Sequence, residues 1–591
     1  MNAKRAIRIA NCSGFYEDRV AAAKEMVEGG PIDVLTGDYL AELTMLVLWK
    51  AKEKDPSAGY VRTFLTQMEQ VLGTCMDRGI RIVTNAGGLN PAGLGSKLSV
   101  LAEQLGMAPR IAYLRGDDLV EQIPDLIASG HSLANMDTGQ AFDEAAVEPI
   151  TANAYLGGWG IAAALDAGAD IVICPRVADA ALVVGPAAWW HGWGLTDYDQ
   201  VAGAVVAGHV IECGPQATGG NYSFLREVTD RRPLGYPVAA VFADGSSVIT
   251  KHAGTGGLVS KGTVTAQLLY ETGDPAYENP DVVAHFDTLK LSQLTPDQVM
   301  ITGVQGSPPS GSTKVAINYL GGYRNSMTLV LTGLDIDEKA SWAEQQLFEI
   351  VGGRDTFAKV DTRLIRYERP DAPSNEQATA HLRITVEDPD AKKVGRRFSD
   401  ATMELALGGY PGFHTTTPPA SPNLYGVYWP ALVPSYLVRQ EVVMNDGSTL
   451  LVPPVPSSST DRSAGEASHL RSDVGDPIAM GATRRVPLGA LCGARSGGQG
   501  GNAKIGLWTT DAESYSWLEQ YLTVDQFRGL LVEAQDLTVR RYRLPNLNAL
   551  NFVVVGLLGD DVAASARLDP QAKGLGEYIR SRYVDIPESL L

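Results

Sequence analysis

The chain has 591 residues, of which 45% are hydrophobic, and a formal net charge of −19 at pH 7. This length suffices for several hydrophobic cores, and the acidic balance excludes a nucleic-acid-binding protein, which needs clustered Lys and Arg. No apolar run approaches the roughly 20 residues of a membrane span, and no signal peptide precedes the first strand. The five cysteines are far apart and form no CxxC pair, which favours the reducing cytoplasm.

Strand and helix patterns alternate over the first part of the chain. Apolar strands are predicted at residues 6–10, 32–36, 80–84, 111–114 and 170–174, with helices between them that include 17–28, 92–106 and 155–167. This alternation is typical of βαβ units and predicts a Rossmann-like domain over residues 1–235 with a mostly parallel sheet. No strand is followed by GxGxxG or a Walker A sequence, so dinucleotide or nucleotide binding is not predicted.

Polar side chains and glycines follow these strands. Ligands of open α/β sheets bind outside the carboxyl ends of the strands, and turn chemistry alone does not demand Asp, Arg and Ser there. We therefore predict a site formed by Asn11, Ser13, Asp38, Asn85, Gly87, Gly88, Arg176 and Asp179. Gly87 and Gly88 fit either an anion-binding helix N-terminus or an ordinary helix start. Arg176 and Asp179 fit either a ligand clamp or an ion pair.

The stretch Gly208–Asn221 has the highest density of reactive groups and glycines. Gly208 is predicted to cap a helix that ends at Ala207. The catalytic candidates after it are His209, Glu212 and Cys213, and the candidate ligand contacts are Gln216, Thr218, Gly219, Gly220 and Asn221. The alternative is a tight turn with an inert, buried thiol. No metal site is predicted, because His209 and Glu212 lack further ligands at zinc-site spacing.

Three further regions complete the predicted organisation. Residues 236–452 read as an α+β region, in which the glycine-rich loop 251–257 carries a histidine and a lysine. Residues 453–485 are rich in Pro, Ser and charge, which is typical of a linker. Residues 486–591 predict a small ferredoxin-like α+β domain. Its glycine-rich run 494–504, with Arg495 and Lys504, fits either an anion cradle or a flexible hairpin.

Several long motifs, in this order, resemble the acyclic terpene utilisation (AtuA-like) family. The motifs are Ile9–Tyr16, Thr36–Glu42, Thr84–Gly88 and Gly208–Asn221, and the resemblance spans about residues 5–455. The tail, with 494–497 and 544–552, resembles the ferredoxin-fold domain often fused to that family. The chain departs from the family at Gly498 and Gln499, where an acidic–basic pair is usual, and this weakens a catalytic role for those two positions.

The resemblance implies a step in the bacterial breakdown of citronellol and geraniol, through branched acyl-CoA intermediates. The implied reaction is hydration, or retro-aldol-type cleavage, of a 3-hydroxyglutaryl-like acyl-CoA. Coenzyme A is then part of the substrate, and no separate cofactor is expected. The class of protein also suggests a homo-oligomer.

Three hypotheses about function follow. In the first, a lyase or hydratase uses His209 or Glu212 as base, and Asp38 and Asn85 position a hydroxyl group. The N–H groups of 87–88 or 219–220 would hold the thioester oxyanion, and Arg495 and Lys504 would hold the CoA phosphates. In the second, Cys213 is the nucleophile of an acyl transferase or thioesterase, with His209 as its base. In the third, the chain is a non-catalytic acyl-CoA- or metabolite-binding subunit.

Overall fold

The structure, a computed structural model, describes residues 4–458 and 481–591. Most of the predicted linker, 459–480, lies outside the described residues. The chain forms two compact units. The first comprises the described residues of Met1–Asn318, Tyr428–Val562 and Asp569–Leu591, and the second comprises Tyr319–Val427 and Ala563–Leu568.

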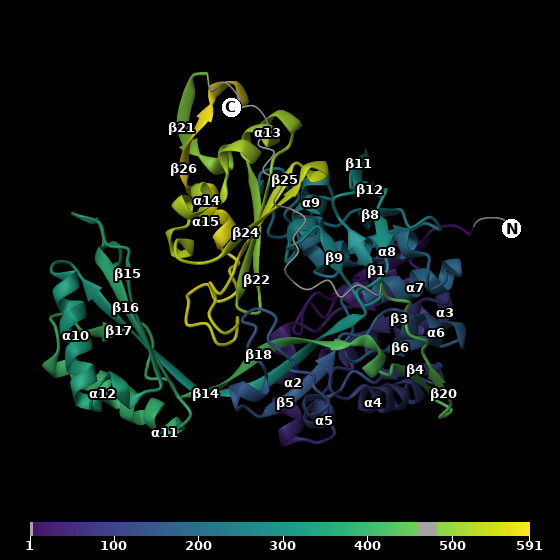
Figure 1. The fold of residues 1–591 in the computed structure, drawn as a ribbon, viewed down its shortest axis with the longest axis horizontal. Helices are drawn as coiled ribbons and strands as arrows, with labels where there is room; N and C mark the ends of the chain where they lie inside the picture. Colours follow the sequence, from purple (N-terminus) through teal and green to yellow (C-terminus); the bar gives the residue numbers. More distant parts are fainter. Residues whose placement is uncertain (1–3, 459–480) are drawn as a thin grey trace. The chain divides into compact units, whose positions relative to one another are not determined.

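The first unit is built on an eleven-stranded mixed sheet (Figure 1). Its centre is parallel, in the order β1 (Ile7–Asn11), β2 (Val34–Gly37), β3 (Arg81–Thr84), β6 (Ile171–Ile173) and β4 (Ile111–Arg115). The prediction of a mostly parallel sheet therefore needs correction. Antiparallel strands extend both edges: β7 (Pro237–Val241), β8 (Ser247–Lys251), β12 (Gln298–Thr302) and β11 (Lys290–Thr295) beside β1, and β19 (Glu441–Met444) and β20 (Thr449–Leu451) beside β4.

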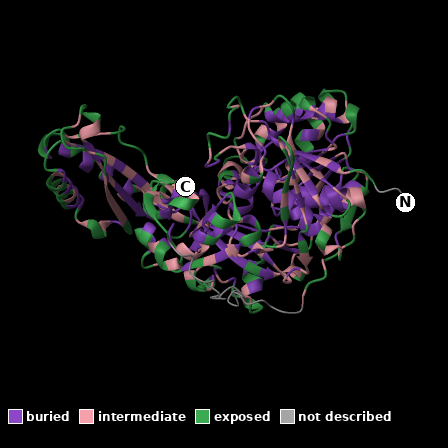
Figure 2. Ribbon diagram, turned by 90° about the horizontal axis from the view of Figure 1, so that it is seen from above, coloured by how far each residue is buried: buried purple, intermediate pink, exposed green. Residues whose placement is uncertain are grey.

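Helices cover both faces of the parallel strands, because alternate strand residues point to opposite faces. Val34 belongs to one hydrophobic core and Leu35 to the other. The first core includes α6 (Trp159–Asp166), α7 (Ala181–His191), α8 (Tyr198–Ile211) and α9 (Lys261–Leu269). The second includes α1 (Ala22–Gly29), α2 (Glu42–Lys54), α3 (Arg62–Arg78) and α4 (Pro91–Gln104). Figure 2 shows the buried residues along the strands and the exposed residues on outer helix surfaces and loops.

Two helices begin later than predicted. The first helix begins at Ala22 rather than at residue 17, because the preceding residues form a turn in which Asp18 accepts from the Gly14 N–H group. The helix predicted from 155 begins at Trp159, because residues 149–154 form strand β5 (Pro149–Ala154), which pairs with β14 (Ser312–Thr332).

The C-terminal domain belongs to the first unit and has its own sheet, in the order β22 (Gly493–Gln499), β23 (Asn502–Trp508), β25 (Ala549–Val554) and β24 (Val539–Leu544). Helices α13 (Ala512–Tyr521), α14 (Val524–Leu530) and α15 (Leu575–Ser581) contribute to its core. A short 3-10 turn, Leu488–Ala490, precedes β22, which begins at Gly493. The glycine-rich run 494–504 forms the β-hairpin of β22 and β23.

The second unit pairs β15 (Lys359–Arg366), β16 (Thr379–Asp388) and the latter part of β14. Helices α10 (Ile336–Val351) and α12 (Arg396–Gly408) share its hydrophobic core with this sheet. Among the described residues of both units, no helix combines the length and the apolar character needed to cross a membrane.

Candidate functional site

The ends of the parallel strands bring the predicted polar residues together. Asp38 follows β2 and Asn85 follows β3, and the Asn85 side chain donates a hydrogen bond of 2.6 Å to Asp38 Oδ1. The other side-chain atom of Asn85, Oδ1, accepts from the Tyr39 N–H group at 2.8 Å. Both side chains are buried. Adjacent parallel strands end at one edge of the sheet, and that is why residues 47 positions apart meet here.

Arg176, past the end of β6, is held on three sides. Its guanidinium group donates to the Leu40 carbonyl at 2.7 Å, forms a short ion pair with Asp179, and lies 4.2 Å from the centre of the Tyr155 ring. Burial opposes the charged form, but Asp179, Tyr155 and Asp38 together raise the pKa of Arg176. Of the two alternatives, the pair with Asp179 forms; the Arg176 side chain in it is 3% exposed and the Asp179 side chain is 36% exposed. The Arg176 Nε atom is buried without a hydrogen-bond partner.

Helix α8 ends at this edge and carries His209 and Glu212. The helix continues to Ile211, so the prediction that Gly208 caps it is wrong. Gly208 lies inside the helix. The position requires glycine because a Cβ atom there would come within 2.8 Å of Ala180 Cα, where α7 begins. One helical turn places His209 Nδ1 3.3 Å from Glu212 Oε1.

The titration of these groups is set mainly by burial. The His209 ring packs against Tyr277 and Phe286, and burial lowers its pKa to about 4, which keeps the ring neutral at pH 7. Burial, followed by the nearby Asp179, raises the pKa of both Asp38 and Glu212 well above the usual range. Glu212 also raises the pKa of Asp38, because like charges in a dry site oppose each other. Two carboxyl groups of raised pKa therefore lie in this region.

Cys213 lies directly after these residues and is the one cysteine of the five that is partly exposed. Its backbone packs against Gly14, where a Cβ atom would come within 2.7 Å of the Cys213 carbonyl carbon. Burial and then Glu212, Glu271 and Asp38 raise the pKa of the thiol. The thiolate form, which a nucleophilic cysteine needs, is therefore disfavoured.

Other predicted ligand contacts are engaged inside the protein. Asn11 Nδ2 donates to the carbonyl groups of Ile211 and Glu212, at 2.7 and 2.9 Å, and so caps the end of α8. The Ser13 hydroxyl donates to the Phe15 carbonyl, and the Thr218 hydroxyl donates to the Gly235 carbonyl at 2.6 Å. Asn221 is exposed. These four side chains are not directed at the group around Asp38.

The predicted oxyanion donors need the same correction. The N–H groups of Gly87 and Gly88 donate to the carbonyls of Cys174 and Asn85, and those of Gly219 and Gly220 donate to the carbonyls of Gln216 and Pro215. The bonds of Gly88, Gly219 and Gly220 close tight turns, and the bond of Gly87 reaches the segment after β6. These four N–H groups are therefore not free to hold a thioester oxygen, and Gly87 and Gly88 form an ordinary helix start before α4.

The C-terminal domain delivers two cations to the same region. Arg495 donates to the Gln216 side chain through a short hydrogen bond and lies 4.4 Å from the centre of the Tyr270 ring. Lys504 donates to the Glu271 carbonyl at 2.6 Å and to the Gln499 side chain. Burial lowers the pKa of Lys504 to about 8. Both side chains donate hydrogen bonds inside the protein, and Arg495 Nε is buried without a hydrogen-bond partner. These residues do not form the predicted open cradle for CoA phosphates.

Several site residues were not predicted. They are Glu42, Asp117, Tyr155, Glu271, Tyr277, Lys314 and Tyr428. Asp117 follows β4 as Asp38 follows β2, so the same strand-end signal identifies it. It accepts from the Asn153 side chain at 2.7 Å, and burial raises its pKa to about 7. Glu42 begins α2, four residues after Asp38, and burial raises its pKa to about 7 while Lys314 opposes the shift.

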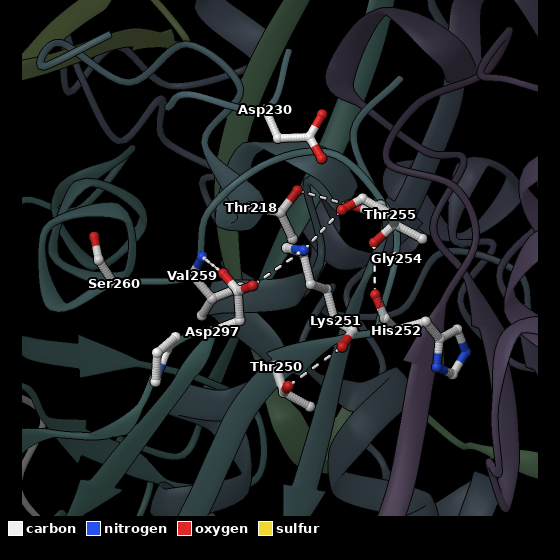
Figure 3. Close-up of polar contacts among 12 residues, drawn as sticks. Thr218, Asp230, Thr250, Lys251, His252, Gly254, Thr255, Val259, Ser260 and Asp297 are labelled. Atoms are coloured by element: carbon white, nitrogen blue, oxygen red, sulfur yellow. Dashed lines mark hydrogen bonds and ion pairs between the residues drawn. The ribbon is translucent and has the colours of Figure 1, made fainter. Parts of the chain in front are cut away.

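The loop 251–257 is not part of this group. Figure 3 shows the Lys251 ammonium group between Thr255 and Asp297. It donates to the Thr255 carbonyl at 2.9 Å and lies 3.2 Å from Asp297 Oδ2. His252 Nε2 lies 2.9 Å from the Met26 carbonyl oxygen. Both side chains stabilise the turn after β8. Throughout the described part of the chain, no three His, Cys, Asp or Glu side chains are arranged to hold a metal ion.

Comparison with known families gives two matches. The model of the acyclic terpene utilisation family protein AtuA matches residues 7–444, and the model of the AtuA ferredoxin-like domain matches residues 486–585. No curated protein and no solved structure matches the chain. The first match covers the parallel strands together with Asp38, Asn85, Arg176 and Glu212, and the second covers Arg495 and Lys504. The chain therefore belongs to the acyclic terpene utilisation (AtuA) family and carries the ferredoxin-like domain at its C-terminal end.

Proposed function

We propose that this protein is an enzyme that performs acid–base chemistry on a branched-chain, terpenoid-type 3-hydroxyacyl-CoA. The reaction is hydration or dehydration, or retro-aldol-type cleavage of the C2–C3 bond. The observation that carries the proposal is the presence of two carboxyl groups of raised pKa in this region, the buried Asp38 at the end of β2 and Glu212 directly after α8. The family membership supports the class of substrate. The parallel centre of the sheet supports a Rossmann-like N-terminal domain, and the five free cysteines support a cytoplasmic setting.

A pair of carboxyl groups is what both reactions require. In dehydration, a carboxylate takes the C2 proton and a carboxylic acid protonates the departing C3 hydroxyl group, so that water and an enoyl thioester form. In retro-aldol cleavage, the carboxylate takes the hydroxyl proton, the C2–C3 bond breaks, and the acid protonates C2. A raised pKa favours the protonated form of a carboxyl group, as the acid role demands. Asn85 orients Asp38, and the unpartnered Nε of Arg176 is the candidate donor to the thioester oxygen.

The thiol alternative receives less support. The groups around Cys213 raise its pKa, whereas a nucleophilic cysteine needs a lowered one. His209, the base of that hypothesis, is buried against two aromatic rings and lies near Glu212. Cys213 is therefore assigned no covalent role in the proposed reaction.

The test is turnover of branched 3-hydroxyacyl-CoA compounds, followed by mass spectrometry for loss of water or for cleaved products. Asp38→Asn and Glu212→Gln should each lower kcat by on the order of 10²- to 10⁴-fold, because each removes a proton-transfer group and keeps its shape. Cys213→Ala should turn the substrate over at a rate within a few fold of the parent chain and should form the same product. Full turnover by both carboxyl variants, or an acyl adduct on Cys213, would contradict the proposal.

A further inference from the structure

The turn that follows α9 contains a non-glycine residue in a left-handed conformation. Glu271 has φ of +58°. A side chain with a Cβ atom is strained in this region, and such a residue persists where its surroundings hold it. Its neighbours Tyr270 and Thr272 are buried. The contacts around this turn therefore show which part of the protein holds Glu271 in the strained conformation.

Those contacts come from one face of the C-terminal sheet. Along β22 and β23 alternate residues point to opposite faces, and one face, with Ala494, Ala503 and Ile505, enters the domain's own core. The opposite face carries Arg495 and Lys504, and the residues paired with them are glycines: Arg495 with Gly506, and Lys504 with Gly497. This second face also carries Trp508, which is paired with Gly493 and belongs to the first hydrophobic core, so this face of the sheet packs against that core.

Each of the three residues of the turn is held by that domain. Tyr270 lies against Gly497, where a Cβ atom would come within 2.6 Å of the ring, and Arg495 and Lys573 lie 4.4 and 4.6 Å from the ring centre. The Glu271 carbonyl accepts from Lys504 at 2.6 Å. The Thr272 carbonyl accepts a short hydrogen bond from the buried Asn551 side chain. Residues more than 200 positions away thus hold the turn in place.

The Glu271 carboxylate acts on the groups of the proposed reaction site. Its charge contributes to the raised pKa of Glu212 and of Cys213, and it opposes the effect of burial on the pKa of His209. The next residue, Thr272, places its hydroxyl oxygen 3.4 Å from His209 Nε2. The Glu271 carboxylate lies 3.9 Å from Lys573 Nζ, which belongs to the C-terminal domain, and its side chain is 33% exposed, so it lies at a solvent-accessible part of the group.

We propose that Glu271 is a further carboxylate of the reaction site and that the C-terminal ferredoxin-like domain is the element that positions it there. Lys504 and Asn551 are positioning residues in this arrangement. The inference rests on the proposed function, because that function identifies the group around Asp38 and Glu212 as a reaction site. Its test needs no substrate, so its failure and a failure of the proposed function are distinguishable.

The test uses Cys213 as a reporter in the full-length chain. Iodoacetamide modifies the thiolate, and the other four cysteines are buried. The charged groups that face the thiol are Glu212, Glu271, Asp38 and Arg495. Loss of the Glu271 charge in Glu271→Gln should lower the thiol pKa, so that alkylation of Cys213 near pH 8, followed by peptide mass spectrometry, is about three- to tenfold faster. An unchanged rate would show that Glu271 does not face the site.

The positioning role of Lys504 and Asn551 is tested by whether their substitution speeds or slows the alkylation of Cys213. In Lys504→Met, loss of a cation alone would raise the thiol pKa and slow alkylation. Release of Glu271 from its position lowers the thiol pKa and speeds alkylation, which is the expected result. Asn551→Leu also releases the turn but changes no charge, and it should likewise speed the alkylation of Cys213. Slower or unchanged alkylation in both variants would overturn the positioning role.

Two glycine variants guard against a folding artefact. Glu271→Gly removes the carboxylate and relieves the left-handed strain, so it should fold at least as stably as the parent chain and still alkylate faster. Asp371→Gly makes the same change at an exposed left-handed acidic residue of the second unit and should leave the rate unchanged. A faster rate in Asp371→Gly, or a parent-like rate in Glu271→Gly, would contradict the proposal. Absence of turnover in the parent chain would count against the proposed function only. The alkylation rates of Cys213 would still test the position of Glu271.

Discussion

The Asn85 side chain donates a hydrogen bond of 2.6 Å to Asp38 Oδ1, and this bond joins the ends of two adjacent parallel strands. The same amide accepts from the Tyr39 N–H group through its oxygen, so both of its polar atoms are used in a fully buried position. The bond opposes the rise in the Asp38 pKa that burial causes. Asn85 thus orients the acid of the proposed reaction and moderates its proton affinity.

Asn85→Ala should destabilise the protein, because it leaves the Tyr39 N–H group and the Asp38 carboxyl without their buried partner. The expected loss is about 1–3 kcal/mol in the free energy of unfolding, measured in urea. Asn375→Ala, at an exposed position, is the matched control and should change that free energy by less than about 0.5 kcal/mol. Equal effects of the two substitutions would argue against a buried, fully used amide.

Arg176→Met should cost about 3–5 kcal/mol of stability, because removal of one partner leaves a buried polar network uncompensated. The lost contacts are the hydrogen bond to Leu40, the ion pair with Asp179 and the packing on Tyr155. Arg5→Ala is the control: Arg5 pairs with Asp33 but is 54% exposed, so its loss should cost about 0–1 kcal/mol. A cost for Arg176→Met within the range of the control would contradict the buried arrangement.

Asp117→Asn should change the pH dependence of stability. The pKa of Asp117 is about 7 in the folded protein, whereas an unfolded Asp ionises near pH 4. Between these values the native state keeps a proton that the unfolded state has lost, so stability falls as pH rises from about 4 to about 7 and is level above that. The advantage of the parent chain over Asp117→Asn should shrink by on the order of 2–4 kcal/mol across this window.

Urea unfolding of both proteins at several pH values checks this prediction. Glu42, with its own raised pKa of about 7, is present in both and cancels in the difference. A difference that grows with pH, as a salt-bridged carboxylate would give, would have the wrong sign.

Lys251→Met should lower stability without affecting the proposed site. It removes the ion pair with Asp297 and leaves the Thr255 carbonyl without its donor, at an expected cost of about 1–3 kcal/mol. The rate of Cys213 alkylation should not change, because the loop lies outside the group around Asp38. Lys24→Ala, which breaks an exposed pair with Glu28, should cost less than about 1 kcal/mol in the same measurement. A changed alkylation rate in Lys251→Met would place the loop in contact with the site.

The sequence by itself determined the alternation of strands and helices and the convergence of Asp38, Asn85 and Arg176. Parallel strands end at one edge of a sheet, so the residue after each strand is placed by local pattern alone. The same rule extends to Asp117, which follows β4. The sequence also determined the family, because its motifs are long and occur in order.

Only the tertiary structure decided which of these groups are free to act. The N–H group of Gly87 is used by the Cys174 carbonyl and that of Gly220 by a turn. Gly208 lies inside α8, at a position where the close approach of Ala180 leaves no room for a Cβ atom. The sheet is mixed because chain segments far beyond β4 return as antiparallel edges. The directions of Arg495 and Lys504, and hence the position of Glu271, depend on contacts between segments more than 200 residues apart. Local sequence patterns carry no information on such contacts, since the contacts join segments that are distant in sequence and depend on how the C-terminal domain packs on the first hydrophobic core.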